Sequence, residues 1–113
     1  MKIYLGFINY NKKSIKLLLI DDEEDFTELT ENYLNKLSRE SFIISKRSSA
    51  KEAIEILDKQ KFDVVISDYQ MPEKDGLELL AEIRNSDKNY KNIPFIILTG
   101  RGREEIVIKS LNL

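Results

Sequence analysis

The fold is decided by the stretch Phe62-Asp63-Val64-Val65-Ile66-Ser67-Asp68-Tyr69-Gln70-Met71-Pro72. Its apolar, β-branched run from Val64 to Ile66 is bounded by polar residues, which predicts a strand buried on both faces. Such strands lie at the centre of parallel sheets that helices cover on either side. In open α/β sheets, ligands bind just beyond the carboxyl ends of the strands, and Asp68 stands at such an end. We therefore expect Asp68 to belong to a functional site.

The composition is that of one soluble domain and excludes several kinds of chemistry. The chain has 113 residues, of which 42% are hydrophobic and 34% are charged. Its net charge is −2 and its basic residues are scattered, so we expect no nucleic-acid partner. There is no Cys and no His, which excludes thiolate sites, a His base and a His phosphate carrier. No apolar run reaches about 18 residues, so we expect a cytoplasmic protein with no membrane span.

Strands and helices are predicted to alternate along the whole chain. Three further apolar runs predict strands at 15–20, 42–45 and 94–99. Apolar residues at helical spacing predict helices at 26–37, from Ser49 to before Lys61, at 77–84 and at 103–111. This alternation, with short connections, predicts a parallel sheet with right-handed crossovers. We assign residues 1–15 to an N-terminal extension and residues 16–113 to the domain.

Two details of the helices can be predicted from spacing. Phe26, Leu29, Tyr33 and Leu37 recur at the helical period and predict the buried stripe of the first helix, flanked by Thr30 and Leu34. Ser49 and Glu52 have the spacing of a capping box, which predicts where the second helix begins.

Acidic and hydroxyl side chains follow three of the predicted strands. Asp21 and Asp22, then Asp68, then Thr99 stand at carboxyl ends that meet at one edge of the sheet. Crowded carboxylates repel one another, and protonation of one of them or a divalent cation relieves the repulsion. Oxygen ligands of this kind suit Mg²⁺, and the turn at Met71-Pro72 leaves the Gln70 carbonyl as a further ligand. An Asp nucleophile beside a metal and a hydroxyl indicates phosphoryl transfer.

Three motifs together carry a family resemblance. They are the run 17–20 with Asp21-Asp22-Glu23, then Asp68-Tyr69-Gln70-Met71-Pro72 with Gly76, then Leu98-Thr99-Gly100. From residue 16 to residue 113 the chain resembles the receiver (CheY-like) domain of two-component response regulators. The resemblance implies a flavodoxin-like, doubly wound parallel sheet of order 2-1-3-4, an order that this family exemplifies.

The resemblance also implies a role for each residue of the site. Asp68 would accept a phosphoryl group from a sensor histidine kinase or a histidine phosphotransfer protein. Mg²⁺ would be handled by Asp21, Asp22, Asp68 and the Gln70 carbonyl. Thr99 would bind the phosphoryl oxygens, and the small Gly100 would leave the site open to the donor. Glu23 would tune metal binding, and Arg101 would affect hydrolysis of the phosphorylated Asp68. The chain would then be a signalling module and not an independent enzyme.

The chain departs from the family pattern at its C-terminal end. The family's fifth strand and fifth helix are missing, and no residue matches the family's phosphoryl-binding Lys or its aromatic switch residue. Lys109 lies in the predicted fourth helix and is no substitute by position. The strand ending at Thr99 would be an unpaired edge, which predicts self-association. We interpret the departure as truncation of the chain. The alternatives are that another copy of the chain supplies the missing edge or that Ile3–Ile8 covers the exposed edge.

Other interpretations of the same residues stay open. Asp22 can serve as a helix cap, and Arg101 as a solvated loop residue. A degenerate receiver that binds a partner without accepting phosphate would share the fold and the acids. A phosphatase of the haloacid dehalogenase class also uses an Asp after a first strand, but its Asp-x-Asp pattern is not met by Asp21-Asp22-Glu23-Glu24.

Overall fold

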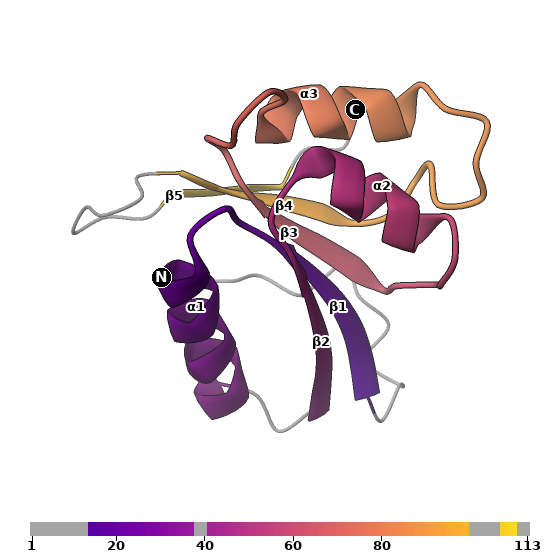
Figure 1. Ribbon diagram of the computed structural model, residues 1–113. Coiled ribbons are helices and arrows are strands. Elements are labelled where there is room, and N and C mark those ends of the chain that lie inside the picture. The colour runs from indigo at the N-terminus through magenta and orange to yellow at the C-terminus, as the bar shows by residue number, and fades with distance from the viewer. Residues whose placement is uncertain (1–13, 38–40, 100–106, 111–113) are drawn as a thin grey trace.

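Four parallel strands form the sheet, and a fifth strand runs antiparallel at one edge (Figure 1). The computed structural model describes residues 14–37, 41–99 and 107–110. The strands are β1 (Ser14–Ile20), β2 (Ser41–Arg47), β3 (Val64–Asp68), β4 (Phe95–Thr99) and β5 (Val107–Ser110). The helices are α1 (Glu24–Leu37), α2 (Ala50–Leu57) and α3 (Gly76–Arg84). The sheet order is β2-β1-β3-β4-β5, so the predicted flavodoxin-like order 2-1-3-4 is confirmed.

The opening stretch is the central strand of this sheet, as predicted. All five residues of β3 are buried, and Ile66 pairs with Leu19 of β1 on one side and with Ile96 of β4 on the other. Alternate residues of a strand point to opposite faces, so each central strand contributes to two cores. Leu18, Ile20 and Val65 pack on the side of α2 and α3. Leu17, Leu19 and Ile66 pack on the side of α1 with Leu34 (Figure 1).

The buried face of α1 differs from the predicted stripe. Leu29 is 66% exposed, whereas Thr30 and Leu34 are at most 2% exposed. The stripe was therefore wrong for Leu29. The buried apolar residue is Leu34, which was predicted only to flank the stripe. The packing of α1 against β2 sets the rotation of the helix and so decides which residues face the sheet.

The predicted fourth helix is wrong for residues 107–110. These residues form β5, which pairs antiparallel with β4 in the register Leu98 with Ile108 and Thr99 with Val107. A short apolar run does not distinguish a helix from a strand, and the β-branched residues here suit a strand. The open hydrogen-bonding edge of β4 supplies the pairing partner.

The same strand removes the reason to expect self-association at β4. Because β5 pairs with it, β4 is not an edge of the sheet, and the prediction of an unpaired edge there is wrong. Among the described residues the outer strands are β2 and β5. The predictions for Ile3–Ile8 and for residues 103–106 and 111 lie outside those residues. No helix in the described ranges is long and apolar enough to cross a membrane.

The connection from β3 to α3 is tightly shaped. The Lys74 amide donates a 2.8 Å hydrogen bond to the Pro72 carbonyl across Glu73, whose φ is 69°. This is a γ-turn with positive φ, the rarer and more strained of the two γ-turn types. Asp75 then caps α3, and its side chain and that of Glu78 form a reciprocal capping box. The loop is therefore held between the end of β3 and a well-capped helix.

Replacing Glu73 by Gly is expected to stabilise the fold. Left-handed backbone costs a residue with a Cβ roughly 1–2 kcal/mol, and glycine adopts it freely. After the entropy that glycine loses on folding, we expect the free energy of unfolding to rise by about 0.5 kcal/mol. Urea denaturation of the two proteins measures this difference. Glu73→Ala, which keeps the Cβ, is the control and should not raise the free energy of unfolding. An equal rise in both variants would refute backbone strain at Glu73.

Candidate functional site

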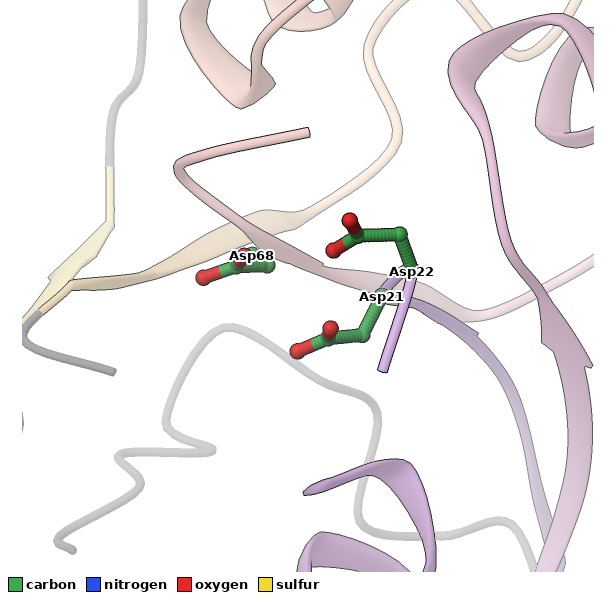
Figure 2. A group of neighbouring side chains, drawn as sticks. All are labelled: Asp21, Asp22 and Asp68. Atoms are coloured by element: carbon green, nitrogen blue, oxygen red, sulfur yellow. The ribbon is translucent and has the colours of Figure 1, made fainter. Parts of the chain in front are cut away.

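Three carboxylates gather where β1 and β3 end (Figure 2). Asp21 and Asp22 follow β1 directly, and Asp68 is the last residue of β3. One carboxylate oxygen of each lies within 4.8 Å of the others. In the part of the chain that the structure describes, no other group of three such side chains is close enough to share a metal ion. The predicted meeting of these acids at one sheet edge is therefore observed.

Two of the three acids are buried. Asp68 is 2% exposed and Asp21 is 4% exposed, whereas Asp22 is exposed. Ionised side chains are seldom buried, since removing a charge from water is costly, and two buried neighbours of like charge repel each other as well. Buried, crowded carboxylates of this kind are typical of functional sites.

The backbone around Asp21 fixes its carboxylate. Its Oδ1 atom accepts a 2.8 Å hydrogen bond from the Glu23 amide, which is the geometry of an Asx turn. The Asp21 amide donates a 3.0 Å bond to the Arg47 carbonyl at the end of β2. The turn that leads into α1 therefore orients this carboxylate, and Glu23 contributes through its backbone amide.

Neighbouring strands and the following loop fix the backbone of Asp68. The Tyr69 amide donates to the Leu98 carbonyl at 2.9 Å, which extends the pairing with β4 beyond the last residue of β3. The Ser67 hydroxyl donates to the Asp68 carbonyl at 2.9 Å. The Gly76 amide donates to the Tyr69 carbonyl at 2.8 Å and so brings the start of α3 back onto this strand end.

Gly76 is a site residue whose role the sequence did not reveal. A Cβ at this position would stand 2.6 Å from the Asp68 carbonyl oxygen and 3.3 Å from the Tyr69 Cα. Both are backbone atoms, so neither can rotate away. In the sequence Gly76 was a loop marker and part of the family motif. The structure shows that glycine is required for the close approach of α3 to the strand that carries Asp68.

The donor set of the cluster fits a hard divalent cation. Mg²⁺ binds oxygen ligands at about 2.1 Å, which places two ligand oxygens at most about 4.2 Å apart. The observed separation of up to 4.8 Å needs only small side-chain shifts to meet this limit. Gln70 is exposed in the loop two residues after Asp68, where its carbonyl can add a neutral ligand.

The remaining predicted residues are placed only in part. Thr99 is the last residue of β4 and lies one position beyond Leu98, the partner of Asp68, so its backbone reaches the same sheet edge. Its side chain, and the whole of Gly100 and Arg101, lie outside the described residues. Lys109 is on β5 and not in a helix.

A separate hollow lies away from the acids. It measures about 590 Å³ and is lined by the connections from α2 to β3 and from α3 to β4, at the opposite edge of the sheet. Within it the Tyr90 hydroxyl donates a 2.8 Å hydrogen bond to Asp58, and burial together with this bond raises the pKa of Tyr90 to about 12. The three acids do not line it. The buried carboxylates therefore identify the opposite edge of the sheet, and not this hollow, as the candidate site.

Two relatives of known name resemble the chain over most of its length. Regulatory protein VanR of Enterococcus faecium is 37% identical over 100 residues, which cover 88% of this chain and 40% of VanR. Chemotaxis protein CheY1 of Helicobacter pylori is 36% identical over 98 residues, covering 86% of this chain and 77% of CheY1. The chain therefore spans less than half of VanR and about three quarters of CheY1.

A solved structure and a family profile agree with these relatives. A response regulator receiver domain protein from Clostridium thermocellum has a TM-score of 0.64 and 31% identity, over 78% of this chain and 67% of that one. The profile of the response regulator receiver domain matches residues 17–113. That range contains the buried acids and the carboxyl ends of β1 and β3 that position them. The chain belongs to the response regulator receiver domain family.

Proposed function

We propose that this chain accepts a phosphoryl group on Asp68 in a two-component phosphorelay, with Mg²⁺ as its cofactor. The observation that carries the proposal is the carboxylate of Asp68, buried at the end of the central strand within 4.8 Å of two further acids. Membership of the receiver family supports it, because receiver domains are phosphoaccepting signalling modules. The donor would be the phosphohistidine of a sensor histidine kinase or of a histidine phosphotransfer protein, and the setting the cytoplasm.

In this transfer the protein mainly positions the reacting groups and neutralises charge. A carboxylate oxygen of Asp68 attacks the phosphorus atom, the P–N bond of the phosphohistidine breaks, and the leaving imidazole nitrogen takes up a proton. Catalysis of such transfers comes mainly from alignment and from neutralising charge on the phosphoryl oxygens. The hydrogen bonds that fix the backbone at Asp68 supply alignment. A magnesium ion, when bound, supplies positive charge.

Each neighbouring residue has a separate task in this proposal. Asp21, held by the Glu23 amide, and the exposed Asp22 would bind the metal together with Asp68 and the Gln70 carbonyl. Thr99 would donate a hydrogen bond to the phosphoryl group. Gly100 would leave room for the donor, and Arg101 would act on hydrolysis. These last three roles remain predictions from the family resemblance.

A degenerate receiver that only binds a partner is the second candidate. Its motivation is the sequence pattern, in which no residue was matched to the family's phosphoryl-binding Lys. The acids and the fold are common to both candidates, so metal binding does not separate them. Covalent labelling does, because only a working receiver forms a bond between Asp68 and phosphorus.

The test is intact-mass analysis of the full chain after incubation with phosphoramidate, a small donor with a P–N bond. With Mg²⁺ we expect the mass to increase by one phosphoryl group, and with EDTA we expect no increase, since the charge of the metal is needed. Peptide mapping after borohydride reduction should locate the adduct at Asp68. An unlabelled chain, under conditions that label another receiver domain, would favour the degenerate receiver.

A further inference from the structure

The hydroxyl of Ser67 is buried in β3, immediately before Asp68. Ser67 is 0% exposed and follows Val65 in the alternation of the strand, on the face that packs against α2 and α3 (Figure 1). Asp68 follows Val64 and Ile66 and belongs to the opposite face, on the side of α1. Ser67 can therefore act on the acid cluster through the backbone that the two residues share.

This hydroxyl contacts both ends of the segment 68–71. Its Oγ atom donates a 2.9 Å hydrogen bond to the Asp68 carbonyl and lies 3.8 Å from the Met71 Sδ atom. A hydroxyl carries one hydrogen and a thioether sulfur is a weak acceptor, so the carbonyl takes the stronger bond. The Met71 side chain also packs against the core cluster on this face. Ser67 thus joins the end of β3 to the loop that follows it.

The peptide unit that joins Asp68 to Tyr69 is held at both ends. Its carbonyl accepts the bond from Ser67, and its amide donates a 2.9 Å bond to the Leu98 carbonyl of β4. Gly76 lies close to the same unit, since a Cβ there would stand 2.6 Å from the carbonyl oxygen. A unit whose carbonyl and amide are both bound cannot rotate without losing a bond. The Ser67 bond therefore helps to set the direction in which the chain leaves Asp68.

Two residues further on stands Gln70, whose carbonyl is a proposed ligand of the metal. The Tyr69 carbonyl before it accepts a 2.8 Å bond from the Gly76 amide. Met71 after it is held by the core and by the contact with Ser67. Mg²⁺ requires nearly ideal octahedral geometry, with oxygen ligands at about 2.0–2.1 Å, so its ligands tolerate little displacement.

We propose that Ser67 is a positioning residue for Mg²⁺. Its hydroxyl holds the segment 68–71 so that the Asp68 carboxylate and the Gln70 carbonyl face the same ion. This inference rests on the proposed function and adds a residue that lies outside the motif of the family resemblance. Removing a group that orients metal ligands commonly weakens metal binding by 10–100-fold. Because Ser67 acts through the backbone, we expect Ser67→Ala to weaken Mg²⁺ binding by about tenfold.

A Mg²⁺ titration of the full chain, followed by amide NMR shifts at constant ionic strength, tests this expectation. Ser86→Ala is the matched control, because the Ser86 hydroxyl also donates to a backbone carbonyl, that of Ile83, at 2.7 Å. That bond lies after the end of α3, away from the acids. The control should bind Mg²⁺ like the parent chain. Equal affinities of the parent and Ser67→Ala would overturn the proposal.

A parallel titration with Ca²⁺ separates positioning from a general disturbance of the site. Ca²⁺ accepts a flexible arrangement of oxygen ligands at about 2.3–2.6 Å, so a small displacement should affect its binding less. We expect Ser67→Ala to lower the affinity for Mg²⁺ several-fold more than the affinity for Ca²⁺. An equal loss for the two ions would contradict a positioning role.

Amide hydrogen exchange in EDTA tests the same role without any metal. In Ser67→Ala the Tyr69 and Gly76 amides should exchange about fivefold faster, because the peptide units they hold lose a supporting bond. The Asp21 amide, which donates to the Arg47 carbonyl, is the internal reference and should exchange at its parent rate. Unchanged exchange at Tyr69 and Gly76 would refute the proposed support by Ser67.

Two features of the design keep the outcomes separate. If Ser67→Ala does not fold, Ser67→Cys is measured instead, since it fills nearly the same space and offers only a weak donor. Labelling of the parent chain decides the proposed function. A parent chain that binds Mg²⁺ but is not labelled would refute that function, and the comparison with Ser67→Ala would still decide whether Ser67 positions the ion.

Discussion

Asp68→Asn is expected to abolish covalent phosphoryl labelling. The amide oxygen is a poor nucleophile, and the other two acids of the cluster are held by β1 and the turn after it, not by the central strand. The measurement is the same intact-mass assay with phosphoramidate and Mg²⁺. Asp87→Asn removes an exposed carboxylate in the connection after α3 and is the matched control, which should label like the parent chain. Persistent labelling of Asp68→Asn would show that another residue is the phosphoacceptor.

The same substitution should weaken the stabilisation of the fold by Mg²⁺. A bound ion stabilises a protein by about 2.7 kcal/mol at one hundred times its Kd, and Asp68→Asn removes one of the three carboxylates that would bind it. Thermal unfolding of both proteins with and without Mg²⁺ measures this difference.

The opening stretch shows what a sequence can reveal about this fold. A β-branched run ending in an acid predicted both the central position of β3 and the place of Asp68, because burial on both faces leaves a nearly continuous apolar pattern. The meeting of Asp21 with Asp68 followed from topology, since parallel strands deliver their carboxyl ends to one edge. These predictions rest on regular geometry, which a sequence pattern reports well.

The failures lie where tertiary contacts decide between local options. Residues 107–110 have apolar spacing that fits a helix, yet the open edge of β4 makes a strand the better solution. Leu29 has the right period for the buried stripe of α1, but the contact with β2 rotates it into solvent. In both cases the local pattern allows two structures, and a neighbour that is distant in sequence selects one of them.

The helix caps were also predicted only in part. Ser49 caps α2 as predicted, and its hydroxyl accepts a 3.2 Å bond from the Glu52 amide. The Glu52 carboxylate, however, accepts hydrogen bonds from Ser48 and not from Ser49, and these bonds lower its pKa. The reciprocal capping box is instead at Asp75 and Glu78, where the loop after Asp68 enters α3. The spacing therefore predicted the cap residue but not the partner of the Glu52 carboxylate.

Gly76→Ala is expected to destabilise the fold and to slow phosphoryl labelling together. In an ordinary helix, Gly→Ala stabilises by roughly 0.5–1 kcal/mol, so the sign of the effect is itself informative. Here the new Cβ would stand 2.6 Å from the Asp68 carbonyl oxygen, and either α3 or the end of β3 must move. We expect a loss of about 1–3 kcal/mol in the free energy of unfolding, as for overpacked cores.

The control for Gly76→Ala lies in the same turn of α3. Leu77 is 39% exposed, so Leu77→Ala should cost less than about 1 kcal/mol and leave the labelling rate unchanged. If the backbone at Asp68 is what the glycine protects, Gly76→Ala must reduce the labelling rate at a temperature where the variant is fully folded. Stability lost with an unchanged labelling rate would mean that the helix moves and the strand end does not. A stabilised Gly76→Ala would show that the close approach of α3 to the strand end does not hold in solution.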